Sequence, residues 1–111
     1  METINLSIGN EKILMEKRAN HQGKILSYGG KLILTTKRLY FKPHRFNIGG
    51  NDIIIELNNI IDFGKTQTMF GTSKEMWINL KGGVLVRFVV WGREEILQTM
   101  KKQIALLNKN S

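Results

Sequence analysis

The spacing of the apolar residues changes at Gly92, and this change constrains the fold more than any other feature of the chain. Before Gly92, apolar side chains recur at every second position in short segments, which is the spacing of β-strands with one buried face. After Gly92 the spacing becomes the 3.6-residue period of an amphipathic helix, seen at Ile96, Leu97, Met100, Ile104 and Leu107. We therefore expect a sheet first and one helix last.

Glycine-containing turns, Gly29-Gly30 among them, divide the first part of the chain into segments of strand length. Residues 13–19 fit either a strand or a short helix, and the strand is favoured. Strands are expected at 31–36 and 38–43, joined at Thr36-Lys37. Further strands begin at Ile53, with Ile53, Ile55 and Leu57 facing inward, and at Ile61. The last two, 75–80 and 84–90, form a hairpin across Lys81-Gly82-Gly83.

These segments predict an α+β fold of about seven strands, over about residues 12–91, followed by a helix over about residues 93–108. Glu94 and Glu95 stand in the first turn of this helix and Lys109 near its end, as the helix dipole favours. We expect a single domain over residues 1–111. In it, a bent antiparallel sheet forms a sandwich or barrel, and the apolar stripe of the helix caps its open end.

The net charge of the chain is confined to one stretch. Eight Lys and Arg residues and no acidic residue lie between Lys17 and Arg45, and the remaining nine basic and nine acidic residues cancel. The +8 of the whole chain is therefore local, and it coincides with the predicted strands of residues 30–46. A one-sided basic surface on a β scaffold indicates an anionic partner.

Composition restricts the class of protein further. A chain of 111 residues with 41% hydrophobic content can bury one core. The chain has no cysteine, which excludes disulfides and fits a reducing compartment. Residues 1–10 lack the basic start and apolar run of a signal peptide, and no apolar run reaches the ~18–20 residues of a membrane span. The expected location is cytoplasmic, including peripheral attachment to a membrane.

The segment Gly30 to Phe41, with the sequence GKLILTTKRLYF, resembles the signature of a GRAM domain. GRAM domains have the pleckstrin-homology-like (PH-like) fold. Ala19-Asn20-His21 and the segment Phe88 to Glu94 are also similar to small stand-alone members, and the resemblance extends from Glu11 to Ala105. It implies a strongly bent sheet of seven strands capped by the C-terminal helix.

The resemblance also implies a class of function. GRAM domains are non-catalytic modules, several of which are thought to bind phosphoinositides or other anionic lipids, whereas others serve as protein-interaction surfaces. The fold alone does not choose between these uses.

The residues themselves point to one strand as a candidate site. Alternation places Arg38, Tyr40, Lys42 and His44 on one face, with Leu39 and Phe41 on the other. Ammonium and guanidinium groups bind phosphate oxygens, and a tyrosine can stack or hydrogen-bond beside them. The candidate ligand-binding residues are therefore Lys37, Arg38, Tyr40, Lys42, His44 and Arg45. The alternative is that these cations only keep an exposed strand soluble.

Several aromatic residues have two interpretations. Arg87 shares a strand face with Trp91 and is expected to stack on it rather than to contact a ligand. Trp77 is either exposed, as at a membrane or protein interface, or covered by the N-terminal segment. Met69-Phe70 is expected to fold back onto the core, with insertion into lipid as the alternative.

Two patterns typical of enzymes are incomplete in this chain. Gly64-Lys65-Thr66 matches the end of a phosphate-binding loop, but Asn59 replaces the earlier glycine and no helix is expected to follow. His21 and His44 do not make a recognisable metal site in a chain without cysteine. We therefore expect a non-enzyme, with no catalytic residue, no metal ligand and no cofactor.

Three functions remain. The first is binding of an anionic surface such as lipid headgroups, through the basic strand face. The second is a protein-interaction module that uses a strand edge or a helix face. Nucleic-acid binding is a distant third, because Arg38-Leu39-Tyr40-Phe41 lacks the glycines of an RNA-recognition motif.

Overall fold

The computed structural model of the chain describes residues 11–23, 26–44, 52–66 and 74–109. The predicted architecture of seven strands and one C-terminal helix is confirmed. The elements in chain order are β1 (Ile13–Gln22), β2 (Ser27–Thr35), β3 (Arg38–Pro43), β4 (Ile53–Glu56), the 3₁₀ turn η1 (Leu57–Asn59), β5 (Ile60–Lys65), β6 (Glu75–Leu80), β7 (Val84–Val90) and α1 (Arg93–Lys109).

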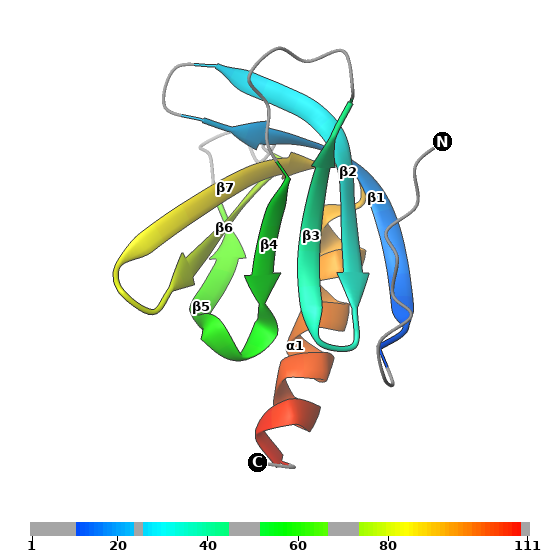
Figure 1. Cartoon of the computed structure of the whole chain (residues 1–111), viewed down its shortest axis with the longest axis vertical. Helices are drawn as coiled ribbons and strands as arrows, with labels where there is room; N and C mark the ends of the chain where they lie inside the picture. Colours follow the sequence, from blue (N-terminus) through cyan, green and yellow to red (C-terminus); the bar gives the residue numbers. More distant parts are fainter. Residues whose placement is uncertain (1–10, 24–25, 45–51, 67–73, 110–111) are drawn as a thin grey trace.

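All seven strands belong to one antiparallel sheet, in the order β4-β3-β2-β1-β7-β6-β5. The sheet is strongly bent, and β1 and β2 cross from one half to the other (Figure 1). β1 makes the bend possible because it pairs with β2 along its whole length but with β7 only from Ala19 to His21. We call the side that faces the core and α1 the inner face, and the opposite side the outer face.

The segment around Gly29-Gly30 is a strand and not the predicted turn. β2 starts at Ser27 and β1 continues to Gln22, so the two strands are longer than expected. Gly30 is buried, and a Cβ atom there would collide with the carbonyl oxygen of Lys42 on the neighbouring strand. The glycine therefore serves close packing within the sheet.

The hairpin between β6 and β7 is confirmed at Lys81-Gly82-Gly83. Gly82 and Gly83 have φ angles of +91° and +84°, which L side chains rarely adopt. The N–H of Gly83 donates to the carbonyl oxygen of Leu80 at 3.1 Å and closes the turn. A Cβ atom at either position would meet no other atom within 4 Å, so the backbone conformation, and not a lack of space, requires glycine here.

The predicted inward positions form the core. Ile55 and Leu57 are buried, although Leu57 lies in η1 and not in a strand, and Ile53 packs beside them. Ile61 is 58% exposed because an irregularity between Ile60 and Asp62 turns Ile60 inward in its place. The buried cluster comprises Ala19, Leu32, Leu34, Leu39, Phe41, Ile55, Leu57, Ile60, Met76, Ile78, Phe88, Val90, Ile96 and Met100.

The helix closes the core from the inner face, and its C-terminal turns lie at the lower end of the view in Figure 1. Ile96 and Met100 are fully buried, while Leu97, Ile104 and Leu107 pack partly buried against the same cluster. The amide of Gln103 donates to the carbonyl oxygen of Thr36 at 2.8 Å and ties α1 to the β2–β3 turn. Within the described part of the chain, α1 lacks the length and hydropathy needed to cross a bilayer.

Candidate anion-binding face

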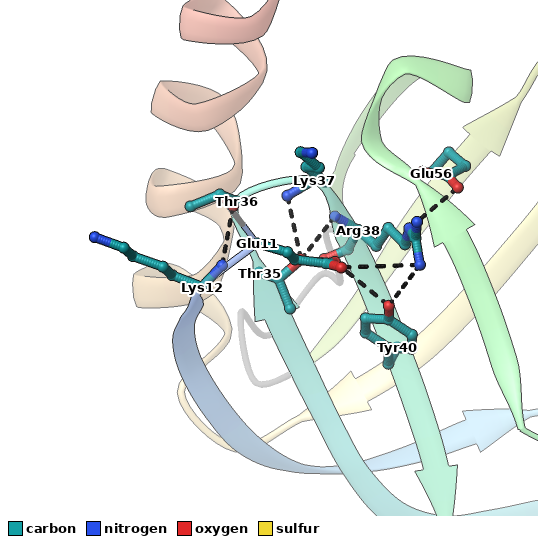
Figure 2. Close-up of polar contacts among 8 residues, drawn as sticks. All are labelled: Glu11, Lys12, Thr35, Thr36, Lys37, Arg38, Tyr40 and Glu56. Atoms are coloured by element: carbon teal, nitrogen blue, oxygen red, sulfur yellow. Dashed lines mark hydrogen bonds and ion pairs between the residues drawn. The ribbon is translucent and has the colours of Figure 1, made fainter. Parts of the chain in front are cut away.

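A buried carboxylate organises the start of β3. The Glu11 side chain, which precedes β1, is only 4% exposed. It accepts hydrogen bonds from the Thr35 hydroxyl at 2.6 Å and from the Tyr40 hydroxyl at 3.3 Å (Figure 2). A buried carboxylate is stable only when such partners replace its hydration. The contacts therefore hold the chain before β1 against the β2–β3 hairpin.

Arg38 completes this network. Its Nη1 donates to the Tyr40 hydroxyl at 3.0 Å and lies 3.8 Å from Glu11, while its Nε lies 3.1 Å from Glu56 on β4 (Figure 2). The hydrogen bond with Tyr40 is the main cause of a raised Arg38 pKa, and the charges of Glu11 and Glu56 act in the same direction. Arg38 and Tyr40, two of the six predicted site residues, are therefore held together inside the protein's own polar network.

The turn before β3 is capped by Thr35. Its hydroxyl oxygen accepts hydrogen bonds from the backbone N–H groups of Lys37, at 3.1 Å, and Arg38, at 2.9 Å. This is the local turn chemistry in which Ser and Thr hydroxyls replace backbone partners. It leaves the Lys37 side chain exposed at the tip of the hairpin.

The other predicted site residues lie further along β3. Leu39 and Phe41 are in the core, so the predicted alternation of the strand places Arg38, Tyr40 and Lys42 on its outer face. The Lys42 ammonium lies 3.4 Å from Asp52, and His44 is exposed just after the strand. Arg45 lies outside the described residues. The structure thus brings Arg38 and Tyr40 together but spreads the set along the whole strand.

The register of the sheet produces a second basic grouping that the sequence did not reveal. Lys42 on β3 stands directly opposite Lys31 on β2, and Lys31 stands directly opposite Arg18 on β1. We call these three residues the basic row. With adjacent strands about 4.8 Å apart, the row spans about 10 Å of the outer face. Like charges in directly opposed positions lower the stability of a sheet, and the Asp52 carboxylate, 3.4 Å from Lys42, offsets part of this cost.

The basic row continues into Trp91. The N–H of Trp91 donates to the carbonyl oxygen of Arg18 at 3.0 Å, which places the end of β7 beside Arg18. The Arg18 guanidinium lies 5.3 Å from the centre of the indole ring, and the Lys74 ammonium lies 5.5 Å from it. Both distances are typical of cation–π contacts. Trp91 remains 39% exposed.

The expected contact between Arg87 and Trp91 is wrong. Arg87 lies opposite Trp77 in the β6–β7 ladder. Four residues along a strand separate Arg87 from Trp91, which is about 13 Å, beyond the reach of a stacking contact. The cation that reaches Trp91 from the sheet is Arg18, which is 73 positions away in sequence and adjacent only through strand pairing.

Trp77 has a local partner. It stands opposite Gly64 on β5 and is half-buried, and a Cβ atom at Gly64 would lie 2.9 Å from its ring. The glycine leaves space for the indole, which is the close approach that a glycine inside a strand often marks. Residues 1–10 of the N-terminal segment, one expected cover for Trp77, lie outside the described residues. So does Met69-Phe70, which the sequence predicts to fold back onto the core or to insert into lipid.

The segment Gly64-Lys65-Thr66 ends strand β5 and does not form a phosphate-binding loop. The Lys65 ammonium is 2.8 Å from Glu94 in the first turn of α1. This hydrogen bond lowers the pKa of Glu94 and links β5 to the helix. Among the residues that the structure describes, no group of three His, Cys, Asp or Glu side chains is placed to hold a metal ion.

Comparison with known proteins identifies the fold. No protein-family model and no curated protein matches the chain. Among solved structures, the C-terminal domain of an unknown protein from Leishmania infantum superposes with a TM-score of 0.73 and 16% identity, covering 86% of this chain and 85% of that one. The Vps36 N-terminal PH domain gives a TM-score of 0.69 and 13% identity over 89% and 83% of the two chains. The predicted PH-like fold is confirmed.

Proposed function

We propose that this chain is a non-catalytic, GRAM-type binding module that attaches peripherally to an anionic surface, such as lipid headgroups on the cytoplasmic face of a membrane. The observation that carries the proposal is the basic row, in which Arg18, Lys31 and Lys42 stand side by side on three adjacent strands. A surface of anionic groups offsets the repulsion within the row, because each well-placed cation contributes about 1 kcal/mol to binding an anionic membrane.

The other basic residues of the 17–45 stretch that the structure describes divide into two groups. Lys17 lies 3.2 Å from Glu95 on α1 and Arg38 is held by acidic partners, so both serve the fold. Lys37, at the hairpin tip, is five positions from Lys42 along β3, about 16 Å at the rise of a strand. That separation exceeds the size of one phosphate group. It favours an extended surface over a single-headgroup pocket.

The predicted site residues therefore take different roles in this proposal. Lys42 contacts the anionic surface as part of the basic row, where a headgroup replaces its exposed ion pair with Asp52. Lys37 adds charge at the hairpin tip, and His44 and Arg45 stay predicted contacts. Arg38 and Tyr40 position the β2–β3 hairpin through Glu11 and do not contact the ligand. Reversal of Arg38 would break the buried network, so the test leaves it unchanged.

The test is co-sedimentation with vesicles of phosphatidylcholine alone or with phosphatidylserine, at low salt. We expect binding to the anionic vesicles only. Neutralising the basic row with R18Q/K31Q/K42Q should weaken this binding by about 100-fold, the loss expected for three cations of about 1 kcal/mol each. The matched control K81Q/K101Q/K102Q removes three exposed lysines elsewhere and should retain most of the binding.

A protein partner is the second candidate function. β4 is an edge of the sheet, and Ile54 on it is 60% exposed, so a peptide strand can pair there. Absence of binding to anionic vesicles at low salt would overturn the lipid proposal and favour this candidate. Equal losses in the two triple variants would remove the basic row from the site.

A further inference from the structure

We infer that Trp91 is a membrane anchor, which enters the headgroup region of an anionic bilayer while Arg18 and Lys74 bind phosphates beside it. The inference rests on the proposed function and adds to it the contact residue and the partner, a lipid bilayer. It concerns a residue at the junction of β7 and α1 that lies outside the predicted site set.

The position of Trp91 is fixed while its ring is left accessible. Its backbone N–H donates to the carbonyl oxygen of Arg18, and the preceding residue, Val90, is fully buried in the core. The following residue, Gly92, has a φ of +95° and starts the turn into α1. A large aromatic side chain on such a rigid frame, 39% exposed, offers apolar area at little entropic cost.

The surroundings of the ring match a membrane interface. Tryptophan is enriched at the headgroup level of membranes, where the apolar part of its ring is buried and its indole N–H stays hydrated. The two cations lie over the ring, 5.3 and 5.5 Å from its centre, so they are close enough to bind phosphates of the same lipid layer that the indole enters. The basic row extends from Arg18 across β2 and β3, so charge and aromatic surface form one continuous contact area.

A single-stranded nucleic acid is the competing partner for a basic face with an exposed aromatic residue. It would bind by stacking a base on the indole. Arg18 and Lys74 already lie over that ring, so a base would have to displace a cation to stack. Insertion into a headgroup layer leaves both contacts in place, and the geometry therefore favours the bilayer.

The test uses tryptophan fluorescence of the full chain carrying W77F, in which Trp91 is the only tryptophan. With anionic vesicles we expect a blue shift of the emission and quenching by lipids spin-labelled near the headgroup, and no change with neutral vesicles. W91A should weaken vesicle binding about tenfold, the effect of removing part of an aromatic side chain from the interface. W77F alone should bind like the parent chain.

Each result separates the two proposals. Binding that is sensitive to R18Q/K31Q/K42Q, with unshifted Trp91 emission and no loss in W91A, overturns the anchor and leaves the proposed function standing. No binding of the parent chain overturns both. Oligonucleotide binding that quenches Trp91 and displaces the vesicles overturns the bilayer as partner. Thermal unfolding checks that W91A is folded, and the fluorescence result decides the matter if it is not.

Discussion

At the scale of single residues, the cations of this protein divide by their partners more than by their position in sequence. Arg38 was expected to contact a ligand because it alternates with Lys42 on one strand. In the structure it is bound by Tyr40 and by acidic groups from two other segments, Glu11 and Glu56. Glu11 is 24 positions from Thr35 in sequence, and no local pattern shows that it is buried. Side-chain alternation predicts a face correctly but cannot show which charges on it are already neutralised.

His21 makes the free energy of unfolding depend on pH. Its ring lies 5.9 Å from that of Phe41 and 5.5 Å from that of Phe88, and burial lowers its pKa below the ordinary 6.5. As the pH falls below about 6.5 the unfolded chain therefore takes up a proton that the folded chain resists. His21 then costs no stability above this pH and destabilises the fold progressively below it, down to the lowered pKa.

We expect H21F to reduce the loss of stability between pH 7.5 and pH 5.5, measured by urea unfolding at both pH values. The control is H44Q, because His44 is exposed and lies after β3. Its pH dependence should match that of the parent chain. An H21F variant with the parent pH dependence would show that His21 is not the group responsible.

At the scale of elements, the strand and helix types were predictable from the period of the apolar residues, and the ends of β1 and β2 were not. The strand 38–43, the hairpin 75–90 and the C-terminal helix were anticipated because their patterns are regular. β1 and β2 were predicted too short, since Gly29-Gly30 looks like a turn in sequence. Only the approach of the Lys42 carbonyl explains why Gly30 lies inside a strand. The basic row depends on this β1–β2 register, so it too could not be predicted from the sequence.

The helix offers a direct test of the packing. Met100 is fully buried against the sheet, whereas Leu106, six residues later on the same helix, is 53% exposed. Replacing Met100 with Ala should lower the free energy of unfolding by about 2–5 kcal/mol, because it leaves a cavity in the core. L106A should change it by about 0.5 kcal/mol or less. Denaturant unfolding measures both, and equal effects would contradict the orientation of α1.

At the scale of the whole molecule, the question is whether net charge or its location controls binding. The chain carries +8, and both triple glutamine variants would carry +5, since each loses three positive charges. An attraction governed by net charge alone would weaken equally in the two variants. An attraction governed by the basic row depends on which three charges are removed, because exposed charges further than ~8–10 Å from the anionic surface are screened at physiological salt.

The dependence of vesicle binding on salt distinguishes these cases. For the parent chain we expect the affinity for anionic vesicles to fall steadily as salt rises from low to physiological concentration, because the basic row exchanges counterions for headgroups. K81Q/K101Q/K102Q should give a parallel curve, since the charges it loses lie away from the contact. R18Q/K31Q/K42Q should give a flatter curve, and what remains should come from the apolar contact of Trp91 together with the cations left near it, such as Lys74. Curves of the same slope for the two variants would mean that the fold presents its charge to the membrane without a preferred face.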